Sequence, residues 1–346
     1  MSAATIPEEV RRSVRIVESL ARLSPSDVVL RQAPHPGEDL VSVVIPMRNA
    51  REWIELCLKG LLVQTHSNLE VFCIDDCSSD DSYERVVGQF GADRRLCVVR
   101  LKRRVGPYQI KNWAIAVMVR GRFVAMQDAD DLSHPARIAV QLAWMREHGL
   151  RVSGTYVHQF SVHGMGMIRG TEPAIQLHGQ LHNLVLYPTV PAVRTTDDFR
   201  SLFGERRFAL AKHGVMLFEY AVLRELGGFD GRTRIVADTD LNWRLLRFMD
   251  IGNVPRVLYS RRIHAASLTR QPDTAYGSLA REAQRARYDE VQREVARCLG
   301  AGDAHRVKSL CRQDLFHEDV EVEEVHAGFD FGREAATGSH AAVRNR

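Results

Sequence analysis

Short apolar segments alternate with amphipathic ones between residues 41 and 149, and this alternation restricts the fold more than any other feature of the chain. Segments that are apolar almost throughout are typical of strands buried on both faces, as in a parallel sheet covered by helices. The sequence therefore predicts an α/β fold. The expected strands are Val41–Pro46, Leu69–Asp75, Leu96–Leu101 and Arg122–Gln127. The expected helices carry Ile54, Leu58 and Leu61, then Trp113 to Val119, then Ile138, Leu142 and Met145.

A helical extension is expected before this unit, in residues 1–39. Val10, Val14 and Val17 follow helical spacing among arginines, and Pro25 ends the pattern. A basic amphipathic helix can lie on an anionic membrane surface. It can also dock on its own domain, which is the interpretation we favour.

The composition excludes several classes of protein. The 346 residues include 47 basic and 43 acidic side chains, and the net charge of +4 is too small to indicate a nucleic-acid-binding protein. No apolar run approaches the roughly 20 residues that a membrane helix needs, and no signal peptide is visible. Six scattered cysteines without metal-site spacing indicate reduced thiols. We therefore expect a cytoplasmic protein that binds no nucleic acid, with peripheral contact at the inner face of the membrane left open.

Lysine is rare, because only 5 of the 47 basic residues are lysines. Arginine can clamp phosphates with two parallel hydrogen bonds. Such a bias more often records a GC-rich genome, so we expect most arginines to have no functional role.

Acidic side chains gather directly after two of the expected strands, in Asp75–Asp81 and in Asp128–Asp131. Because the carboxyl ends of parallel strands meet at one edge of a sheet, the two clusters are expected to lie together. Crowded carboxylates repel one another unless a cation offsets their charge. Mg²⁺ and Mn²⁺ typically take one or two carboxylates together with phosphate oxygens. The pattern therefore predicts a divalent-metal site for a ligand with a diphosphate.

Each cluster also has a simpler interpretation. The residues of Asp75–Asp81 suit a turn and a helix cap. Asp128–Asp131 could form a calcium loop, although Leu132 occupies a ligand position, or could hold the nucleophile of an aspartyl-phosphate phosphatase. Neither alternative explains both clusters.

A series of blocks in fixed order resembles the family 2 glycosyltransferases, which have the GT-A fold, over about residues 41–270. The blocks are Val41–Asn49, Leu61–Thr65, Glu70–Asp80, Gly106 with Lys111 and Asn112, Asp128–Asp131, Leu226–Asp230, Ala237–Arg244 and Tyr259–Arg270. The resemblance implies a Rossmann-like, mostly parallel sheet flanked by helices. It also implies transfer of a sugar from a nucleotide-diphosphate donor, a UDP-sugar, to an acceptor hydroxyl. The acceptor stays open between a glycan, a lipid-linked intermediate and a small molecule.

On this basis the chain divides into four parts. Residues 40–150 would form the nucleotide-sugar-binding half of the GT-A domain, and residues 151–270 the acceptor-binding and catalytic half. Residues 1–39 are the N-terminal helical extension. Residues 271–346 form a C-terminal extension, which begins with a helix that ends at Gly300 and finishes in a polar tail.

The resemblance implies roles for residues on the donor side. Pro46 and Asn49 belong to a turn that binds the nucleotide. Asp76 would accept a hydrogen bond from the base, uracil, and Asp128 would face the ribose or the metal. Lys111 is a candidate for binding the phosphates, and its alternative is a solvated helix cation.

The remaining implied roles concern the metal and the proton transfer. Asp130 would bind Mn²⁺ or Mg²⁺ directly with Asp131 assisting, and the metal would stabilise the departing diphosphate. His264 could complete the metal shell, orient a phosphate or pack in a loop. Asp238 would be the general base, giving a single displacement with inversion. An acid that opens a helix also complements the helix dipole, which is the simpler role for Asp238.

Departures from the family pattern carry expectations of their own. Cys77 replaces the usual glycine, so we expect a turn that does not need a positive φ. Lys111 replaces the customary arginine, and Ala237 replaces an acidic residue. The main alternative is a catalytically degenerate nucleotide-sugar-binding module that serves another transferase. A nucleotidyltransferase or a phosphatase would not explain the blocks with Asp238 and His264.

Overall fold

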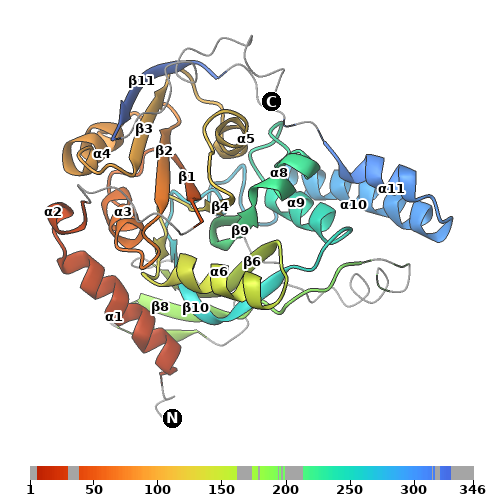
Figure 1. Cartoon of the computed structure of the whole chain (residues 1–346), viewed down its shortest axis with the longest axis horizontal. Coiled ribbons are helices and arrows are strands. Elements are labelled where there is room, and N and C mark those ends of the chain that lie inside the picture. Colours follow the sequence, from red (N-terminus) through yellow and green to blue (C-terminus); the bar gives the residue numbers. More distant parts are fainter. Residues whose placement is uncertain are drawn as a thin grey trace.

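A single twisted β-sheet runs through the centre of the molecule, and helices cover both of its faces (Figure 1). The computed structural model describes residues 6–29, 39–161, 174–177, 180–193, 195, 198, 213–313, 315 and 320–328. Within these residues the sheet has 11 strands, and its main path runs in the order β11-β3-β2-β1-β4-β9-β6-β10-β5. The predicted α/β class is confirmed.

Four neighbouring strands form the parallel part of the sheet and match the predicted strands to within one residue at each end. They are β1 (Val41–Met47), β2 (Leu69–Asp75), β3 (Leu96–Leu101) and β4 (Phe123–Met126). Val41 lies opposite both Leu69 and Phe123, so the carboxyl ends of β1, β2 and β4 meet at one edge. This edge carries both acidic clusters.

Antiparallel strands complete the sheet and make it mixed. Strand β9 (Leu217–Glu219) runs antiparallel to β4 and to β6 (Val152–Ser161), and β10 (Gly252–Ile263) runs parallel to β6. The remaining strands are β5 (Leu132–Ser133) on β10, β11 (Val322–Ala327) on β3, β8 (Gln180–Val185) on β6 and β7 (Ile175–Leu177) on β8. The predicted division into halves at residue 150 stays a prediction.

Each face of the sheet has its own hydrophobic core, because successive strand residues point to opposite sides. Val43 and Ile45 belong to the core under one set of helices, and Val44 belongs to the other core. The first set is α3 (Ile54–Leu62), α4 (Ser82–Phe90) and α6 (Arg137–Glu147). The second set is α5 (Pro107–Val117), α8 (Tyr220–Leu226) and α9 (Ala237–Leu245).

Helix α5 begins earlier than the sequence indicated. The apolar stripe predicted a helix from Trp113, whereas the helix starts at Pro107. Gly106 adopts a φ of 97°, and Pro107 follows in the first turn, where its fixed φ and missing N–H suit a helix start. These two residues therefore fix the conformation of the short loop before α5.

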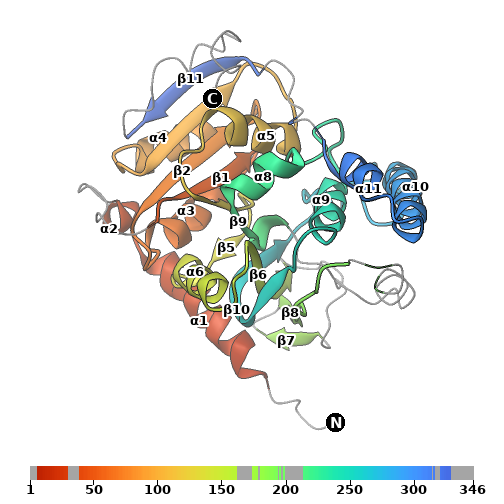
Figure 2. The ribbon, with the colours of Figure 1, turned by 45° about the vertical axis from the view of Figure 1, so that its right-hand side comes forward.

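The N-terminal extension forms α1 (Glu8–Arg22) and α2 (Pro25–Val28). Val10 is fully buried, and Leu20 packs in a cluster with Leu132 and Phe160. In Figure 2, α1 lies along the lower edge of the domain beside α6 and β10. The docking interpretation is confirmed, and membrane contact stays a prediction.

The C-terminal extension forms a helical pair, α10 (Leu279–Gly300) and α11 (Ala304–Cys311), at the right of Figure 1. The two helices pack together through Val295, Cys298, Val307 and Cys311. Tyr288 of α10 packs against Ile235 and Val236, which precede α9. The predicted helix end at Gly300 is confirmed. Among the described helices, none is both long and apolar enough to span a bilayer.

Candidate active site

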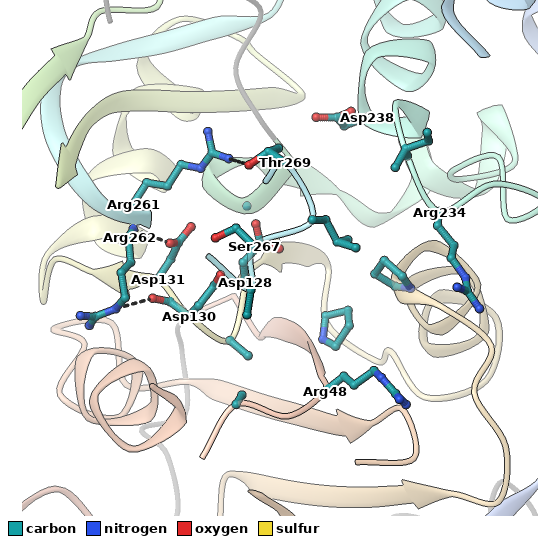
Figure 3. A pocket seen from close by; sticks show the side chains of 18 of the residues that line it. Arg48, Asp128, Asp130, Asp131, Arg234, Asp238, Arg261, Arg262, Ser267 and Thr269 are labelled. Carbon is teal, nitrogen blue, oxygen red and sulfur yellow. Dashed lines mark hydrogen bonds between the residues drawn. The ribbon is translucent and has the colours of Figure 1, made fainter. Parts of the chain in front are cut away.

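A cavity of about 400 Å³ lies at the edge where β1, β2 and β4 end (Figure 3). It brings together side chains from segments that are far apart in the sequence. The predicted site residues that line it are Pro46, Asn49, Asp76, Asp128, Asp130, Asp131, Asp238 and His264. Lys111 is the predicted residue that does not line it.

Asp130 and His264 face each other in this cavity. Oδ2 of Asp130 lies 2.8 Å from Nε2 of His264. The His264 ring packs against Trp53, with ring centroids 5.1 Å apart, and the guanidinium of Arg262 lies 4.5 Å from the centre of the same Trp53 ring. Arg262 Nε also donates to the backbone oxygen of Asp130. Packing on Trp53 therefore fixes the relative positions of the carboxylate and the imidazole.

Asp131 lies in a different environment from its neighbour. Its side chain is buried, and Oδ1 accepts a hydrogen bond of 2.8 Å from the backbone N–H of Arg262. Burial, followed by the charges of Asp130 and Asp128, raises the pKa of Asp131 well above its usual range. Asp131 thus anchors the end of β10 beside the cavity, and direct metal binding by it stays a prediction.

The donor set in the cavity suits a hard divalent cation only if the substrate completes the shell. Within the described part of the chain, no group of three or more His, Cys, Asp or Glu side chains is arranged to hold a metal. Asp130 and His264 form a pair, however, and Asp128 lines the same cavity. Mg²⁺ and Mn²⁺ commonly bind through one or two protein ligands together with phosphate oxygens and water. The residues therefore fit an ion that arrives with a diphosphate.

Asp128 lies between a buried cation and a glycine. Its Oδ1 is 3.6 Å from Nζ of Lys111. A Cβ added to Gly214 would lie 2.8 Å from Asp128 Oδ2 and 2.9 Å from the Tyr259 hydroxyl, so a larger residue at this position would displace these side chains. Gly214 was not among the predicted site residues, because no local signal in the sequence distinguishes it from the other glycines.

The position of Lys111 shows that one of its two predicted roles, a solvated helix cation, is wrong. Its side chain is completely buried on α5, so it is not a solvated helix cation. Burial lowers the pKa of the ammonium, and the negative charges of Asp128 and Asp238 oppose this shift. Lys111 therefore supports the acidic residues from behind the cavity wall. Contact with phosphates stays a prediction.

Asp76 shapes the loop that leads into α5. Its Oδ1 accepts a hydrogen bond of 2.7 Å from the N–H of Val105, and its Oδ2 accepts one of 3.0 Å from the N–H of Gly106. Arg104 lies at ion-pair distance, with Nε 4.0 Å from Oδ2. Each carboxylate oxygen keeps a second lone pair. The hydrogen bond to a base predicted for Asp76 is compatible with this arrangement and stays a prediction.

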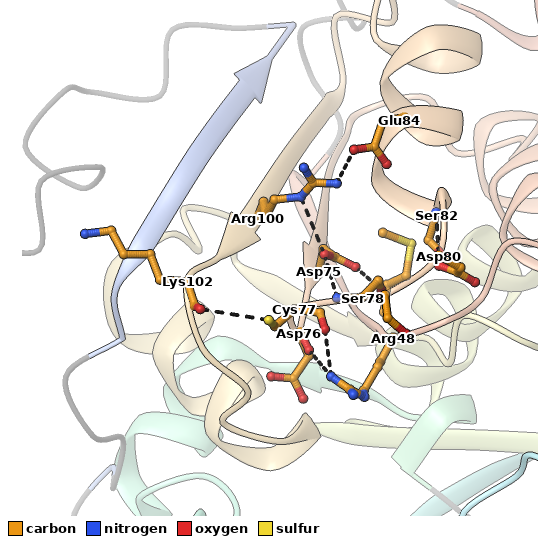
Figure 4. Close-up of polar contacts among 12 residues, drawn as sticks. Arg48, Asp75, Asp76, Cys77, Ser78, Asp80, Ser82, Glu84, Arg100 and Lys102 are labelled. Carbon is orange, nitrogen blue, oxygen red and sulfur yellow. Dashed lines mark hydrogen bonds and ion pairs between the residues drawn. The ribbon is translucent and has the colours of Figure 1, made fainter.

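The turn after β2 differs from the expectation for Cys77. Cys77 has a φ of 57°, so the prediction that this turn does not need a positive φ is wrong. Arg48 Nη1 donates to the backbone oxygens of Asp76 and Cys77 at 2.8 Å each, which holds the strained residue in place (Figure 4). Asn49 joins the same loops, because its Oδ1 accepts from the N–H of Ser79 at 2.8 Å.

Two other acids of the first cluster, Asp75 and Asp80, have structural roles in a turn and at a helix start, as the simpler interpretation of this cluster predicts. Asp75 is buried and accepts hydrogen bonds from the N–H and hydroxyl of Ser78, while Arg100 lies 3.9 Å away (Figure 4). Burial raises the pKa of Asp75, and the hydrogen bonds from Ser78 oppose this. Asp80 similarly binds Ser82 at the start of α4.

Two aspartates at the start of α9 take opposite positions. Asp238 lines the cavity, and its Oδ1 accepts from the N–H of Thr239 at 2.9 Å. Asp240 is buried and binds Arg244 Nε at 2.8 Å. Val236, the residue before α9, has a φ of 68°. This turn of the chain places the first residues of the helix, Asp238 among them, at the cavity.

Six arginines line the cavity: Arg48, Arg104, Arg234, Arg261, Arg262 and Arg281. None of these arginines was a predicted site residue, because the high arginine content of the chain hides functional arginines. The sequence does contain a local signal, because basic residues occur in a run directly after β3 and in a pair at the end of β10. With five aspartates in the same cavity, the site combines both signs of charge at short range.

Residues 42–214, half of the chain, match the family described as glycosyl transferase family 2. The chain belongs to this family, which confirms the resemblance inferred from the ordered blocks.

Several relatives share shorter segments. An uncharacterized glycosyltransferase, RC0461, of Rickettsia conorii is 34% identical over 124 residues, which cover 36% of this chain and 20% of the relative. The putative teichuronic acid biosynthesis glycosyltransferase TuaG of Bacillus subtilis is 34% identical over 116 residues, 34% of this chain and 46% of TuaG. The UDP-Glc:α-D-GlcNAc-diphosphoundecaprenol β-1,3-glucosyltransferase WfaP of Escherichia coli is 28% identical over 107 residues, 31% of this chain and 41% of WfaP. The match thus spans less than half the length of each of these relatives.

Among solved structures, residues 1–349 of S. aureus TarS in complex with UDP-GlcNAc align with a TM-score of 0.48 at 20% identity. The alignment covers 66% of this chain and 60% of that one.

Proposed function

We propose that this protein is a metal-dependent, inverting glycosyltransferase that moves a sugar from a UDP-sugar to an acceptor hydroxyl. One observation carries the proposal. The Asp130–His264 pair and the carboxylate of Asp238 line one cavity, and Figure 3 shows Asp238 well apart from Asp130. A metal site for a leaving diphosphate and a base for a nucleophile need such a separation within one pocket.

On the donor side, Asp130 and His264 would hold Mn²⁺ or Mg²⁺. When bound, the metal would neutralise the charge that develops on the departing diphosphate. Arg262 keeps this pair in place by its hydrogen bond to the backbone oxygen of Asp130 and its packing on Trp53. Asp76 and Asn49 would place the nucleoside, because Asp76 orders the loop before α5 and Asn49 joins the loops that follow β1 and β2.

On the acceptor side, Asp238 would take the proton from the attacking hydroxyl. The hydroxyl oxygen would form a bond to the anomeric carbon while the bond from that carbon to the diphosphate oxygen breaks. The bonding electron pair would leave with the diphosphate, and the proton would remain on Asp238. A single displacement of this kind inverts the anomeric configuration. The N–H of Thr239 stabilises the ionised carboxylate that acts as the base.

The family relationship supports the donor assignment. The name of WfaP describes a glucosyltransferase that uses UDP-Glc, and 31% of this chain aligns with it. A UDP-sugar is therefore the first donor class to test. The predicted location, cytoplasmic and in contact with the inner face of the membrane, belongs to the proposal as well.

The test is the release of UDP from a panel of UDP-sugars with Mn²⁺, together with the variant Asp238→Asn. We expect transfer by the native protein, loss of transfer by at least about 100-fold in the variant, and unchanged metal-dependent UDP binding. If the variant kept near-native turnover, Asp238 would not be the base. If the native protein bound UDP but transferred no sugar from UDP, GDP or dTDP donors, it would be a catalytically degenerate binding module.

A further inference from the structure

Two consecutive arginines at the end of β10 serve different parts of the cavity. Successive residues of a strand point to opposite sides. Arg262 points toward Trp53 and the backbone of Asp130. Arg261 points away from that group toward Thr269, and in Figure 3 Asp238 lies on that side of the view.

The guanidinium of Arg261 lines the cavity, and the negative charges of Asp131 and Asp128 act on it from beyond ion-pair distance. Within the described residues its side chain makes one long hydrogen bond, 3.4 Å from Nη2 to Oγ1 of Thr269. No carboxylate of the described residues lies within 4.0 Å of it, in contrast to Lys111 beside Asp128. Burial alone would disfavour this charge, but the nearby acids offset it and raise the pKa of Arg261, so the guanidinium stays charged. A cation that lines a cavity in this way is suited to an anionic ligand.

A second cation and an aromatic ring stand next to this position. Arg281 is buried at the start of α10, where its Nε donates to the backbone oxygen of Thr274 at 2.8 Å. Its guanidinium lies 5.0 Å from the centre of the Tyr276 ring. Tyr276 is 48% exposed, and all three of Arg261, Tyr276 and Arg281 line the cavity. Tyr276 is also among the groups that raise the pKa of Arg261, so these two side chains lie near each other.

We propose that Arg261 and Arg281, together with the Tyr276 ring, form an acceptor subsite for a sugar that carries a carboxylate or a phosphate. The two guanidinium groups would bind the anion, and the aromatic ring would pack against the apolar face of the sugar. The proposal rests on the proposed function, because the subsite lies on the side of Asp238, where the acceptor hydroxyl would be activated.

The donor diphosphate does not account for this pair of arginines. Asp130 and His264 would place the donor, and Arg262 is the β10 arginine in direct contact with Asp130. Arg261 makes its hydrogen bond to Thr269 instead and senses Asp131 and Asp128 only through their charges. The nucleoside end of the cavity has separate cations, Arg48 and Arg104, beside Asp76.

The test uses the full chain saturated with Mn²⁺ and UDP and measures the binding of three probes by ligand-observed NMR. The probes are methyl β-D-glucuronide, methyl β-D-glucoside 6-phosphate and the neutral methyl β-D-glucoside. We expect at least one anionic probe to bind about 10- to 100-fold more tightly than the neutral probe. The difference between the first two distinguishes a carboxylate from a phosphate.

Arg261→Gln is expected to remove this preference, and Arg261→Lys to retain part of it. The matched control is Arg256→Gln, which makes the same change at an exposed position of the same strand outside the cavity. Equal binding of all three probes by the native protein would overturn the proposal, as would an equal loss of preference in the control. If Arg261→Gln weakened UDP binding as much as probe binding, Arg261 would serve the donor, which also overturns it. Failure of UDP itself to bind would instead count against the proposed function.

Discussion

Nζ of Lys111 lies 3.6 Å from Oδ1 of Asp128, behind the wall of the cavity. The charges of Asp128 and Asp238 both act on this ammonium, so one buried cation is shared by an acid of the donor side and the proposed base. Removing one partner of a buried ion pair leaves the other charge without compensation. Lys111 is therefore a positioning residue whose effect should appear in the titration of the base.

Replacing Lys111 by Met should raise the pKa of Asp238, because a nearby positive charge favours the ionised carboxylate. The acid limb of the profile of kcat against pH should then move to higher pH by about one unit. Lys59→Met is a matched control, because Lys59 is also a buried lysine. Its Nζ lies 2.7 Å from Oε1 of Glu55, and neither residue lines the cavity. An acid limb at the same pH in both variants would contradict the role given to Lys111.

Asp130 and Asp131 should respond differently to the same substitution. Asp130→Asn should weaken the apparent affinity for Mn²⁺ by about tenfold or more, as it removes the carboxylate that faces His264. In Asp131→Asn the amide oxygen can still accept the hydrogen bond from the N–H of Arg262. Because this contact anchors β10 rather than the metal, the affinity of this variant for Mn²⁺ should change by less than about threefold. Titration of UDP binding with Mn²⁺ measures both. Equal losses would show that Asp131 is a ligand.

Cys77 offers a test of backbone strain. Its φ of 57° is costly for a residue with a side chain, so Cys77→Gly should raise the free energy of unfolding by about 1 kcal/mol. Cys77→Ala removes the thiol but keeps Cβ, and its stability should stay within about 0.5 kcal/mol of the native value. Urea denaturation measures the difference between the two variants. If alanine and glycine gave the same stability, the hydrogen bonds from Arg48 would not be holding a strained residue.

Asp230 should make the stability of the C-terminal extension depend on pH. Although burial alone would raise it, the pKa of Asp230 is lowered by Arg232, whose Nε donates to Oδ1 at 2.8 Å. Tyr288 of α10 donates to the other oxygen at 3.2 Å. A carboxylate whose pKa is lower in the folded state stabilises the fold above its unfolded pKa and loses this effect as the pH falls through its folded pKa.

Asp230→Asn should therefore destabilise the protein at pH 7, and its difference from the native protein should shrink as the pH falls below about 4. Thermal unfolding across this range measures the effect. Tyr288→Phe keeps the Arg232 contact, which lowers the pKa of Asp230 more than Tyr288 does, so it should retain most of the pH dependence with a lower melting temperature. A deficit of Asp230→Asn that was constant with pH would exclude ionisation of Asp230 as the cause.

The sequence predicted the four parallel strands and the meeting of the acidic clusters, because both follow from local pattern and from the geometry of parallel sheets. It did not predict the conformation of Cys77, since that residue is held by Arg48 from another loop. It also placed Lys111 in solvent as one alternative, because a helix position alone does not show how deeply α5 is covered by the rest of the domain.

The arginines that line the cavity could not be predicted from the sequence for a different reason. Their residue type is so common in this chain that it carries little information, and only the fold separates Arg261 and Arg262 from arginines at the surface. The same holds for Gly214, whose importance depends on an oxygen of Asp128 that is distant in sequence.

The alternation of Arg261 and Arg262 on β10 has an evolutionary consequence. A single point mutation at residue 261 alters one wall of the cavity, while the neighbour that braces Asp130 and Trp53 keeps its contacts. Under the role proposed for Arg261, a change of one codon would alter acceptor binding while the residues proposed to hold the donor stay in place. An insertion or deletion of one residue in this strand would keep an arginine at one of these two places and put Ser260 or Ile263 at the other.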